Sequence, residues 1–535
     1  MRNRALRYSA VALATIALLA SCGSKKRQVI QELPPPPQSS PIATTPTQPS
    51  NWRAPLGDSI RHEIRGVWIT TAYGLDFPKS KADTPNGVRR QQEELERIFD
   101  RLVADGYNTI FFQVRLSGSV NYFSNEPFSR LFTSSGERPA YDPLTFAVEA
   151  AHKRGLALHA WMVTYPLSSL RGVPHPIARN NPSWVILHRG GRHLDPGVPA
   201  VRTYIAKLTA DIVRRYDVDG IHYDYFRYPE EAEKFNDRSS YERYGDGMSR
   251  DAWRRSNLTA QLAEVQDSIK HLKPEVQVSV APLGKLRKLE DLGRPHGWTA
   301  YESVHQDVET WAKRKLVDFV VPMMYYKDDL YEPFLIDWQR RVGRYIPVVA
   351  GLAPYRVDAK EEKYPWAPEV IQQQIQIARK HKAAGVCMFR EGNIGPAQPR
   401  LRTLIQRSFA QTAITPALER GLQNKPAQPR ELQLTVQEGK RLKLSWQMPS
   451  GDRRGISYRV WATTIHPNGK RESMLLVQGL RSTECTLRLA DFQMEDCLEL
   501  GVEAVNRLGV ATPCDKAVEF NLHQERLHHQ QQRKP

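Results

Sequence analysis

Short apolar runs alternate with amphipathic stretches from Ile64 to Gln411, and this alternation constrains the fold more than any other feature of the chain. The first pair is "IRGVWIT" followed by "VRRQQEELERIFDRLVADG", and the last is "VCMFR" followed by "QPRLRTLIQRSFAQ". Continuous apolar strands joined by helices are typical of a parallel sheet covered on both faces. We count eight strand–helix units, which predict an α/β fold of the (β/α)8 barrel type. A doubly wound open sheet is the competing fold, but no glycine-rich phosphate loop follows the first strand.

Changes in composition divide the rest of the chain. The barrel is predicted over residues 61–412, after a segment, residues 22–60, that is rich in proline, serine and threonine. Such a composition predicts a semi-rigid tether. Residues 413–428 form a predicted linker, and residues 523–535 are polar and predicted to be disordered.

A second domain is predicted over residues 429–522, where polar and apolar residues alternate with period two between turn signals. This pattern is typical of a small all-β sandwich. Trp446, Tyr458 and "VEAVNRLG" resemble fibronectin type III domains, although Cys497 stands where that family often has the tyrosine of its corner motif. The sequence therefore predicts a barrel followed by a fibronectin type III-like domain.

Residues 1–21 have the three parts of a signal peptide: a basic start, an apolar run and a close of small residues. The apolar run is too short to span a bilayer as a helix. "LASC" resembles the lipobox of bacterial lipoproteins, which implies cleavage before Cys22 and lipid attachment to its thiol. Gly23 and Ser24 follow, without an aspartate, and under the enterobacterial sorting rule this predicts an outer-membrane anchor facing the periplasm. A plain signal peptide with an incidental cysteine is the alternative.

A formal net charge of +18 indicates a basic surface. Export argues against nucleic acid as the partner, so the anionic polymers within reach are lipid head groups and cell-wall glycans with acidic peptides. Electrostatic steering toward such a polymer is one interpretation, and a merely solvated basic surface is the other. No cysteine or histidine spacing resembles a zinc site, so we expect no metal and no cofactor. An oxidising compartment permits one disulfide among Cys485, Cys497 and Cys514, and the oligomeric state is left open.

Polar and aromatic side chains follow the predicted strands at the ends where a barrel gathers its chemistry. "YDVDGIHYDYFRYP" places Asp224 at the end of the fourth strand. A mouth of rings, hydrogen-bonding groups and carboxylates suits a sugar, because rings stack on its apolar faces and acids transfer protons. We expect these side chains to bind the substrate: Tyr73, Asp76, Gln113, Arg115, Trp161, Tyr165, His222, Arg227, Tyr325, Asp328 and Arg390.

Two carboxyl groups are normally needed to cleave a glycosidic bond. Asp224 is the first candidate. The alternative is a structural role for Asp224, as a helix cap or as a salt-bridge partner of Arg227. Glu391, at the eighth strand, is the predicted second catalytic carboxylate, ahead of Asp76 and Asp328. His222 lies on the same strand face as Asp224, so it either orients that carboxylate or is a satisfied core histidine.

Several ordered motifs resemble the bacterial glycoside-hydrolase-like family 10 between Ile64 and Gln411: "RGVWIT", "DGYNTIFFQVR", "GLALHAW", "YDVDGIHYDYFRYP", "YESVHQDVETWAKRKLVDFVVPMMYY" and "GLAPYR". The resemblance implies a (β/α)8 barrel in an exported bacterial lipoprotein. It implies a glycosidase, because some members are similar to cell-division enzymes acting on peptidoglycan strands stripped of peptides. It also implies catalysis by Asp224 and a cleft containing Arg115, Trp161, His222 and Tyr325.

Departures from these motifs keep a second function open. A second aspartate often follows the first in the family, and here that position is Tyr225. "DGIHYDYFRYP" is also similar to the fourth-strand motif of family-18 chitinases, where a glutamate supplies the proton; here that position is Phe226. The leading hypothesis is an envelope glycosidase for peptidoglycan glycan strands or a related N-acetylhexosamine polymer. The alternative is a carbohydrate-binding lipoprotein whose barrel is catalytically inactive. A third hypothesis, a metal-dependent deacetylase or amidase, has no cluster of His and Asp ligands to support it.

Overall fold

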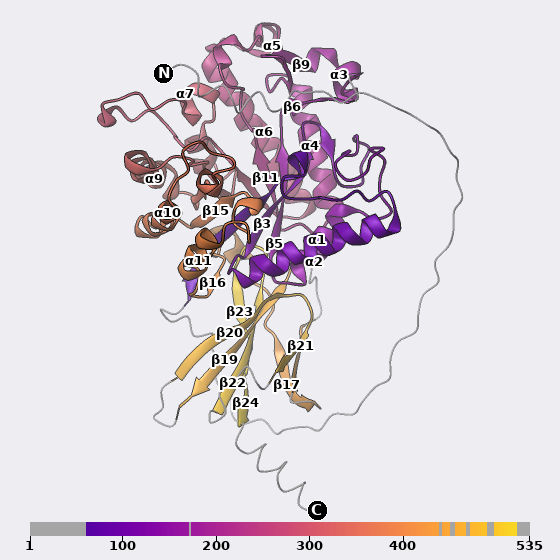
Figure 1. Cartoon of the computed structure of the whole chain (residues 1–535), viewed down its shortest axis with the longest axis vertical. Helices are drawn as coiled ribbons and strands as arrows, with labels where there is room; N and C mark the ends of the chain where they lie inside the picture. The colour runs from indigo at the N-terminus through magenta and orange to yellow at the C-terminus, as the bar shows by residue number, and fades with distance from the viewer. Residues whose placement is uncertain are drawn as a thin grey trace, which may run out of the picture.

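The structure is a computed structural model in which six segments of the chain are described: residues 60–170, 173–437, 441–449, 455–466, 471–488 and 497–521. The predicted signal peptide, Cys22, the tether and the C-terminal tail lie outside these residues. Within them, the chain forms an α/β barrel followed by an all-β part (Figure 1).

Eight parallel strands form the barrel, in the order β13-β12-β11-β5-β3-β2-β15-β14. Isolated parallel bridges, Val320 with Val348 and Met323 with Gly351, connect the two ends of this order and nearly close the sheet. The predicted eight-stranded parallel barrel is therefore confirmed. The strands are β2 (Ile64–Ile69), β3 (Thr109–Leu116), β5 (Ala157–Val163), β11 (Gly220–Asp224), β12 (Gln277–Val280), β13 (Phe319–Val320), β14 (Val349–Leu352) and β15 (Gly385–Phe389).

Alternation along each strand divides its side chains between the barrel interior and the surrounding helices. In β2, Ile64 and Trp68 belong to the interior cluster, whereas Val67 and Ile69 pack in the larger core under the helices. The interior cluster also contains Phe111 of β3 and Trp161 of β5. The barrel is thus a packed core whose last inward side chains meet at the C-terminal ends of the strands.

Amphipathic helices cover the outside of the sheet, as in α1, where Gln91, Leu95, Phe99 and Leu102 are buried on one face. The hydroxyl of Thr84 caps this helix by accepting from the Gly87 N–H at 3.1 Å. The helices that follow the strands are α1 (Pro85–Ala104), α2 (Pro143–His152), α4 (Pro199–Arg215), α6 (Arg250–Leu272), α8 (Val308–Lys313), α9 (Tyr331–Trp338), α10 (Glu369–Lys380) and α11 (Pro399–Ser408).

Insertions enlarge the loops at the C-terminal ends of several strands, opposite the all-β part (Figure 1). The loop after β5 contains a three-stranded antiparallel sheet in the order β6-β10-β9. The inserted elements are β4 (Ser119–Val120), β6 (Pro166–Leu167), β7 (Ser169–Leu170), β8 (Val173–Pro174), α3 (Pro176–Asn180), β9 (Val185–His188), β10 (Gly191–Leu194), α5 (Arg238–Tyr244) and α7 (Ala300–Val304).

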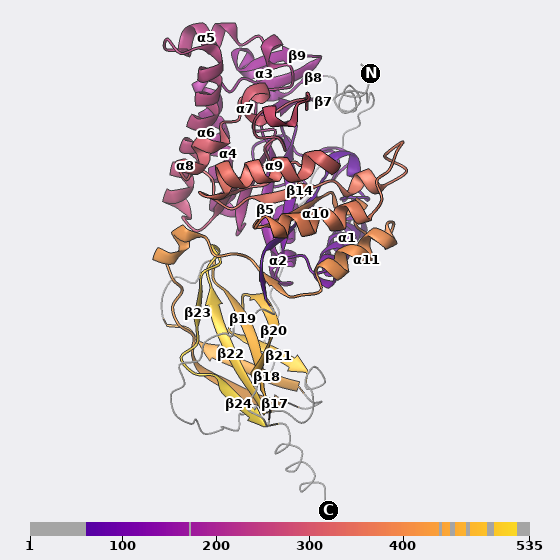
Figure 2. The same cartoon turned by 90° about the vertical axis from the view of Figure 1, so that its left-hand side faces the viewer.

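The all-β part packs two antiparallel sheets, β17-β18-β21 and β20-β19-β22-β23 with β24 paired to β22 (Figure 2). Leu444 and Trp446 of the first sheet share one core with Tyr458, Val460 and Leu500 of the second. Its resemblance to fibronectin type III domains stays a prediction. The strands are β17 (Arg430–Gln437), β18 (Arg441–Gln447), β19 (Ser457–Ile465), β20 (Arg471–Leu480), β21 (Glu484–Arg488), β22 (Cys497–Val505), β23 (Ala511–Pro513) and β24 (Val518–Asn521).

A short parallel pair closes the barrel at its base, where β1 (Arg61–His62) lies beside β16 (Ala413–Ile414). The guanidinium of Arg65 supports this closure by donating to the carbonyls of Phe409 and Gln411, both at 2.7 Å. The start of the predicted linker thus belongs to the base of the barrel.

Candidate active site

Asp224 ends β11 on the inner face of the barrel, two residues after the interior side chain of His222. Its carboxylate accepts from Trp161 Nε1 at 3.2 Å and from the Tyr225 N–H at 2.7 Å. Burial raises the pKa of Asp224, and the nearby Arg227 only partly opposes this rise. The site therefore contains a buried carboxyl group that holds its proton to a higher pH than an exposed aspartate does.

The backbone turns sharply directly after Asp224. Tyr225 has a φ of 48°, in the left-handed region that non-glycine residues seldom adopt. This conformation lets the Tyr225 N–H bond to the preceding carboxylate and leaves the ring partly exposed. Strained backbone of this kind is concentrated at functional sites.

Aromatic rings from three other strand ends gather beside Asp224. The Tyr325 ring lies 5.5 Å from that of Phe389 and 6.0 Å from that of Tyr355, measured between centroids. Phe389 in turn lies 6.5 Å from Trp161, the residue that donates to Asp224. Burial raises the pKa of Tyr325 well above its ordinary value, so its phenol is neutral. These rings provide apolar faces and two tyrosine hydroxyls near the carboxylate.

A second carboxylate, Glu230, is coupled to the first through Arg227. Arg227 Nη2 donates to Glu230 Oε1 at 2.6 Å, and the guanidinium lies 4.6 Å from the centroid of the Tyr225 ring. Burial alone would raise the pKa of Glu230, but the charge of Arg227, together with a backbone hydrogen bond and weaker contributions from His193 and Arg189, outweighs burial, and the net shift is downward. Glu230 also appears among the charges that raise the pKa of Asp224. The mouth thus holds two carboxyl groups whose pKa values are displaced in opposite directions.

Of the two interpretations of His222, the contacts of its ring favour a satisfied core histidine. Its Nε2 accepts from Trp68 Nε1 at 3.0 Å, so Nδ1 carries the proton and donates to Ser279 Oγ at 2.9 Å. The Phe111 ring packs 4.3 Å away, and burial lowers the pKa of His222 well below its ordinary value. His222 is therefore a neutral group in the barrel interior, and Trp161, not His222, bonds to the carboxylate of Asp224.

Glu391 lies in a different cluster from Asp224. It forms an ion pair with Arg101 of α1, and burial raises its pKa while Arg101 opposes the rise. Asp76 is next to it, buried, and accepts from Arg390 Nη1 at 2.8 Å. Among the described residues, Glu391 and Asp224 share no hydrogen-bond or ion-pair partner. The geometry thus makes Glu391, Asp76 and Arg390 a link between the ends of β2 and β15.

Three more predicted substrate ligands hold the loops together. Gln113 Oε1 accepts from the N–H and hydroxyl of Thr71, at 2.9 and 3.0 Å, and so fixes the end of β2. Arg115 is fully buried after a bulge in β3 and donates to the carbonyl of Thr164 at 2.7 Å. Tyr165 is buried against Phe226, with ring centroids 5.7 Å apart. Through these contacts, the three side chains support the loops around the mouth.

Tyr73 and Asp328 complete the predicted set. Tyr73 lies in the loop after β2 and is exposed. Asp328 begins a short helical turn after β13, and its side chain lies outside the described residues. Of the predicted side chains, the structure brings Trp161, Asp224, Arg227 and Tyr325 together at the mouth.

Three mouth residues were missed by the sequence prediction: Glu230, Tyr355 and Phe389. The alternation of β15 contained a signal for Phe389, because Cys387 and Phe389 fall on the inward face and Glu391 lies beyond the strand. Tyr355 lies in the quoted motif "GLAPYR". For Glu230 there was no periodic signal, since its position depends on the turn that follows Asp224.

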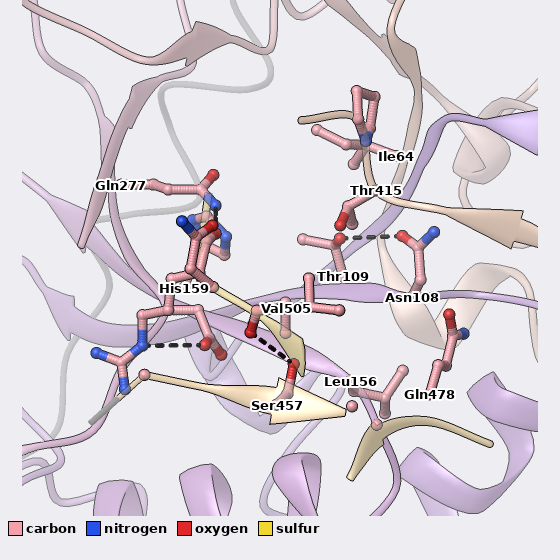
Figure 3. Close-up of a pocket in the computed structure, with 18 of the residues that line it drawn as sticks. Ile64, Asn108, Thr109, Leu156, His159, Gln277, Thr415, Ser457, Gln478 and Val505 are labelled. Atoms are coloured by element: carbon pink, nitrogen blue, oxygen red, sulfur yellow. Dashed lines mark hydrogen bonds and ion pairs between the residues drawn. The ribbon is translucent and has the colours of Figure 1, made fainter. Parts of the chain in front are cut away.

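A separate cavity of about 90 Å³ lies at the opposite end of the barrel (Figure 3). It is lined by residues at the starts of the strands, including Thr109, His159 and Gln277, and by Ser457 and Val505 of the all-β part. Because catalysis in such barrels takes place at the C-terminal ends of the strands, we assign this cavity to the joint between the two parts.

Several expectations concern other kinds of site. Among the described residues, no group of three or more His, Cys, Asp or Glu side chains could hold a metal ion. Searched over the same residues, no helix has the length and apolar character needed to cross a membrane. Cys485 and Cys514 are free thiols, and the side chain of Cys497 lies outside the described part.

The buried carboxylate among aromatic rings lies at the C-terminal ends of the strands, where (β/α)8 barrel enzymes have their active sites. The particular family follows from the sequence profile of Glycosyl hydrolase-like 10, which matches residues 63–367. The chain belongs to this family.

Individual relatives agree with this assignment. Glycosyl hydrolase DigH of Escherichia coli strain K12 is 34% identical over 434 residues, covering 74% of this chain and 96% of that protein. Glycosyl hydrolase YngK of Bacillus subtilis strain 168 is 29% identical over 340 residues, covering 59% of this chain and 66% of that protein. Similarity to solved structures is weaker: alpha-L-fucosidase isoenzyme 2 of Paenibacillus thiaminolyticus superposes with a TM-score of 0.43 at 13% identity, over 65% of this chain and 49% of that one.

Proposed function

We propose that the chain is a cell-envelope lipoprotein that hydrolyses glycosidic bonds in peptidoglycan glycan strands, or in a related N-acetylhexosamine polymer. The observation that carries the proposal is Asp224, a buried carboxyl group with a raised pKa, held by Trp161 among the rings of the mouth. Membership of a glycosyl hydrolase-like family supports the reaction class.

Asp224 and Glu230 suit the two complementary roles that glycoside hydrolysis requires. The raised pKa of Asp224 favours the protonated form, which can donate to the oxygen of the leaving sugar. The lowered pKa of Glu230 favours the carboxylate, which can act as a base toward water or as a nucleophile. Arg227 positions Glu230 and keeps it ionised. We therefore assign the second carboxylate to Glu230 in place of Glu391.

The choice of substrate rests on the rings and on the N-terminal sequence. Tyr325 and Phe389 are half-buried at the mouth and offer faces on which the apolar sides of sugar rings can stack, with the buried rings of Trp161 and Tyr355 packed beside Phe389. Export and lipid attachment at Cys22 would place this mouth next to the cell wall, on the outer membrane facing the periplasm. The anchor is tested by Cys22→Ala: the variant is expected in the soluble envelope fraction, and membrane association unchanged from the native protein would remove this part of the proposal.

The reaction is tested with purified peptidoglycan glycan strands stripped of their peptides. Incubation with the folded protein is expected to create new reducing ends, and mass spectrometry of the products identifies the linkage cleaved. A catalytically inactive carbohydrate-binding barrel is the second candidate, favoured by the burial of Phe226 at the position of the chitinase glutamate. Retention of the strands without new reducing ends would establish that candidate instead.

A further inference from the structure

Among the residues that the structure describes, exposed aromatic side chains occur only in loops at the C-terminal ends of the barrel strands. In the described part of the chain there are four: Tyr73, Tyr225, Trp298 and Tyr364 are 63%, 41%, 44% and 64% exposed. All four lie in loops that follow barrel strands, after β2, β11, β12 and β14. Exposed aliphatic side chains, by contrast, also occur on the helices and on the all-β part, as at Val103 and Met474.

The order of strands distributes these four rings around the mouth. In the sequence β13-β12-β11-β5-β3-β2-β15-β14, strands β2 and β12 are four places apart in a barrel of eight. Tyr73 and Trp298 therefore follow strands on opposite sides, and Tyr364 follows a strand midway between them. With a strand spacing of about 4.8 Å and a tilt of about 36°, such a barrel is roughly 15 Å across at its backbone. A ligand that touches rings on opposite sides must span the whole mouth.

Two of the rings are held by cations on one face. Arg227 lies 4.6 Å from the centroid of the Tyr225 ring, and Lys363 lies 5.4 Å from that of Tyr364. Such a contact stabilises an exposed ring by about 0.5–1 kcal/mol. Single exposed rings are common on protein surfaces, but four rings gathered around one mouth are typical of a binding surface.

We propose that Tyr73, Tyr225, Trp298 and Tyr364, here named the rim rings, form a platform for a glycan chain running across the mouth on both sides of Asp224. The inference rests on the proposed function and extends it to the length of the substrate. A single sugar or a disaccharide reaches only the rings beside Asp224. A strand of many sugars also reaches the rim rings, so the protein cleaves within long strands and favours them over short fragments.

The test compares substrates of two lengths with two variants. Stripped glycan strands and their disaccharide fragments are each digested by the wild type, by the double variant Tyr73→Ala, Trp298→Ala, and by Met474→Ala. Met474 is 48% exposed, similar to Trp298, but lies on β20 in the all-β part. We expect kcat/KM of the double variant to fall about tenfold or more on long strands and to stay unchanged on disaccharides, whereas Met474→Ala should equal the wild type on both.

A binding measurement separates this inference from the proposed reaction. In an Asp224→Asn background, retention on insoluble stripped strands is expected to fall with the same double substitution, whether or not the native protein is hydrolytic. An equal loss of kcat/KM on long and short substrates would overturn the proposal, because the substitutions would then have damaged the catalytic site or the fold and not the binding of a long strand. Unchanged retention and turnover on long strands would also overturn it, and would leave a protein partner as the occupant of the rim rings.

Discussion

The chemistry of Asp224 depends on Trp161, from the neighbouring strand β5, and on Arg227, from its own loop. Strand alternation alone predicts that Asp224 points inward, because His222 and Asp224 share a face. Arg227 was visible in the sequence as a possible partner, but the burial of Asp224 and its hydrogen bond from Trp161 depend on the folded barrel, so their effect on the pKa could not be deduced from the sequence. The prediction for Glu391 had the same limit. The sequence showed that Glu391 lies at a strand end, but it could not show that its carboxylate pairs with Arg101 of α1.

Glu230→Gln and Glu391→Gln form a matched pair of variants that tests the second carboxylate. If Glu230 is the base or nucleophile, Glu230→Gln should lower turnover of stripped glycan strands by about 10²-fold or more. Glu391→Gln should keep most of its turnover but unfold at a lower temperature, because it weakens the buried ion pair with Arg101. Turnover and melting temperature are measured on the same preparations. The opposite pattern would return the catalytic role to Glu391.

The pH dependence of stability provides a second test at Asp224. The folded pKa of Asp224 is raised above its ordinary value of 3.8, so its stabilising contribution is present below about pH 4 and is lost as pH rises through the folded pKa. An asparagine side chain cannot ionise, so Asp224→Asn removes this pH-dependent loss of stability. We expect the variant to gain free energy of unfolding relative to the wild type as the pH rises from about 4 to 7, measured by urea denaturation. A variant that is less stable by a constant amount at every pH would indicate a structural hydrogen bond instead.

At the scale of elements, strands and helices followed from their hydrophobic periods. The eight strands lie where the apolar runs predicted them, and α1 shows the expected buried face. The small sheet β6-β10-β9 and helix α5 were not predicted, because each of these elements is only two to seven residues long. Such segments lack a period that could be recognised in advance.

Close packing of β11 against β5 yields a prediction about one glycine. A Cβ added at Gly220 would lie 2.2 Å from His159 Nδ1 and 3.0 Å from the Gln277 carbonyl oxygen. We expect Gly220→Ala to lower the free energy of unfolding by about 1–3 kcal/mol, as overpacking does elsewhere. Gly191→Ala is the control, because its nearest neighbour, His193 Nε2, is 3.4 Å from the added carbon. Equal stability of the two variants in urea titrations would show that the strand pair is looser than described.

At the scale of the molecule, the two parts meet in a buried network of charges at the base of the barrel. Asp219 accepts from His152 at 2.7 Å and from Arg481 at 3.0 Å, and Arg507 pairs with Asp217 and Glu275. Asp219 lies directly before β11, whereas its partners Arg481, between β20 and β21, and Arg507, after β22, are far along the chain. A contact between such distant segments leaves no local pattern to detect.

Arg507 tests whether this joint stabilises the whole protein. Its side chain is 1% exposed and faces three acidic groups, and burial lowers the pKa of Arg507 to about 10. Arg507→Ala leaves these acids without their partner, so we expect a loss of about 3–5 kcal/mol in the free energy of unfolding. Arg238→Ala, which removes an exposed ion pair with Glu242, should leave the unfolding midpoint unchanged. If both variants unfold at the wild-type midpoint, the all-β part is only loosely attached.

The central claim, that Asp224 takes part directly in glycosidic cleavage, is tested most directly by turnover of Asp224→Asn on stripped glycan strands. The substitution keeps the size of the side chain and an oxygen to accept from Trp161, but removes the acidic proton and the charge. Turnover should fall by at least about 10²-fold while the melting temperature at neutral pH stays the same or rises. Turnover equal to that of the wild type, on a strand that the wild type cleaves, would contradict the catalytic role of Asp224.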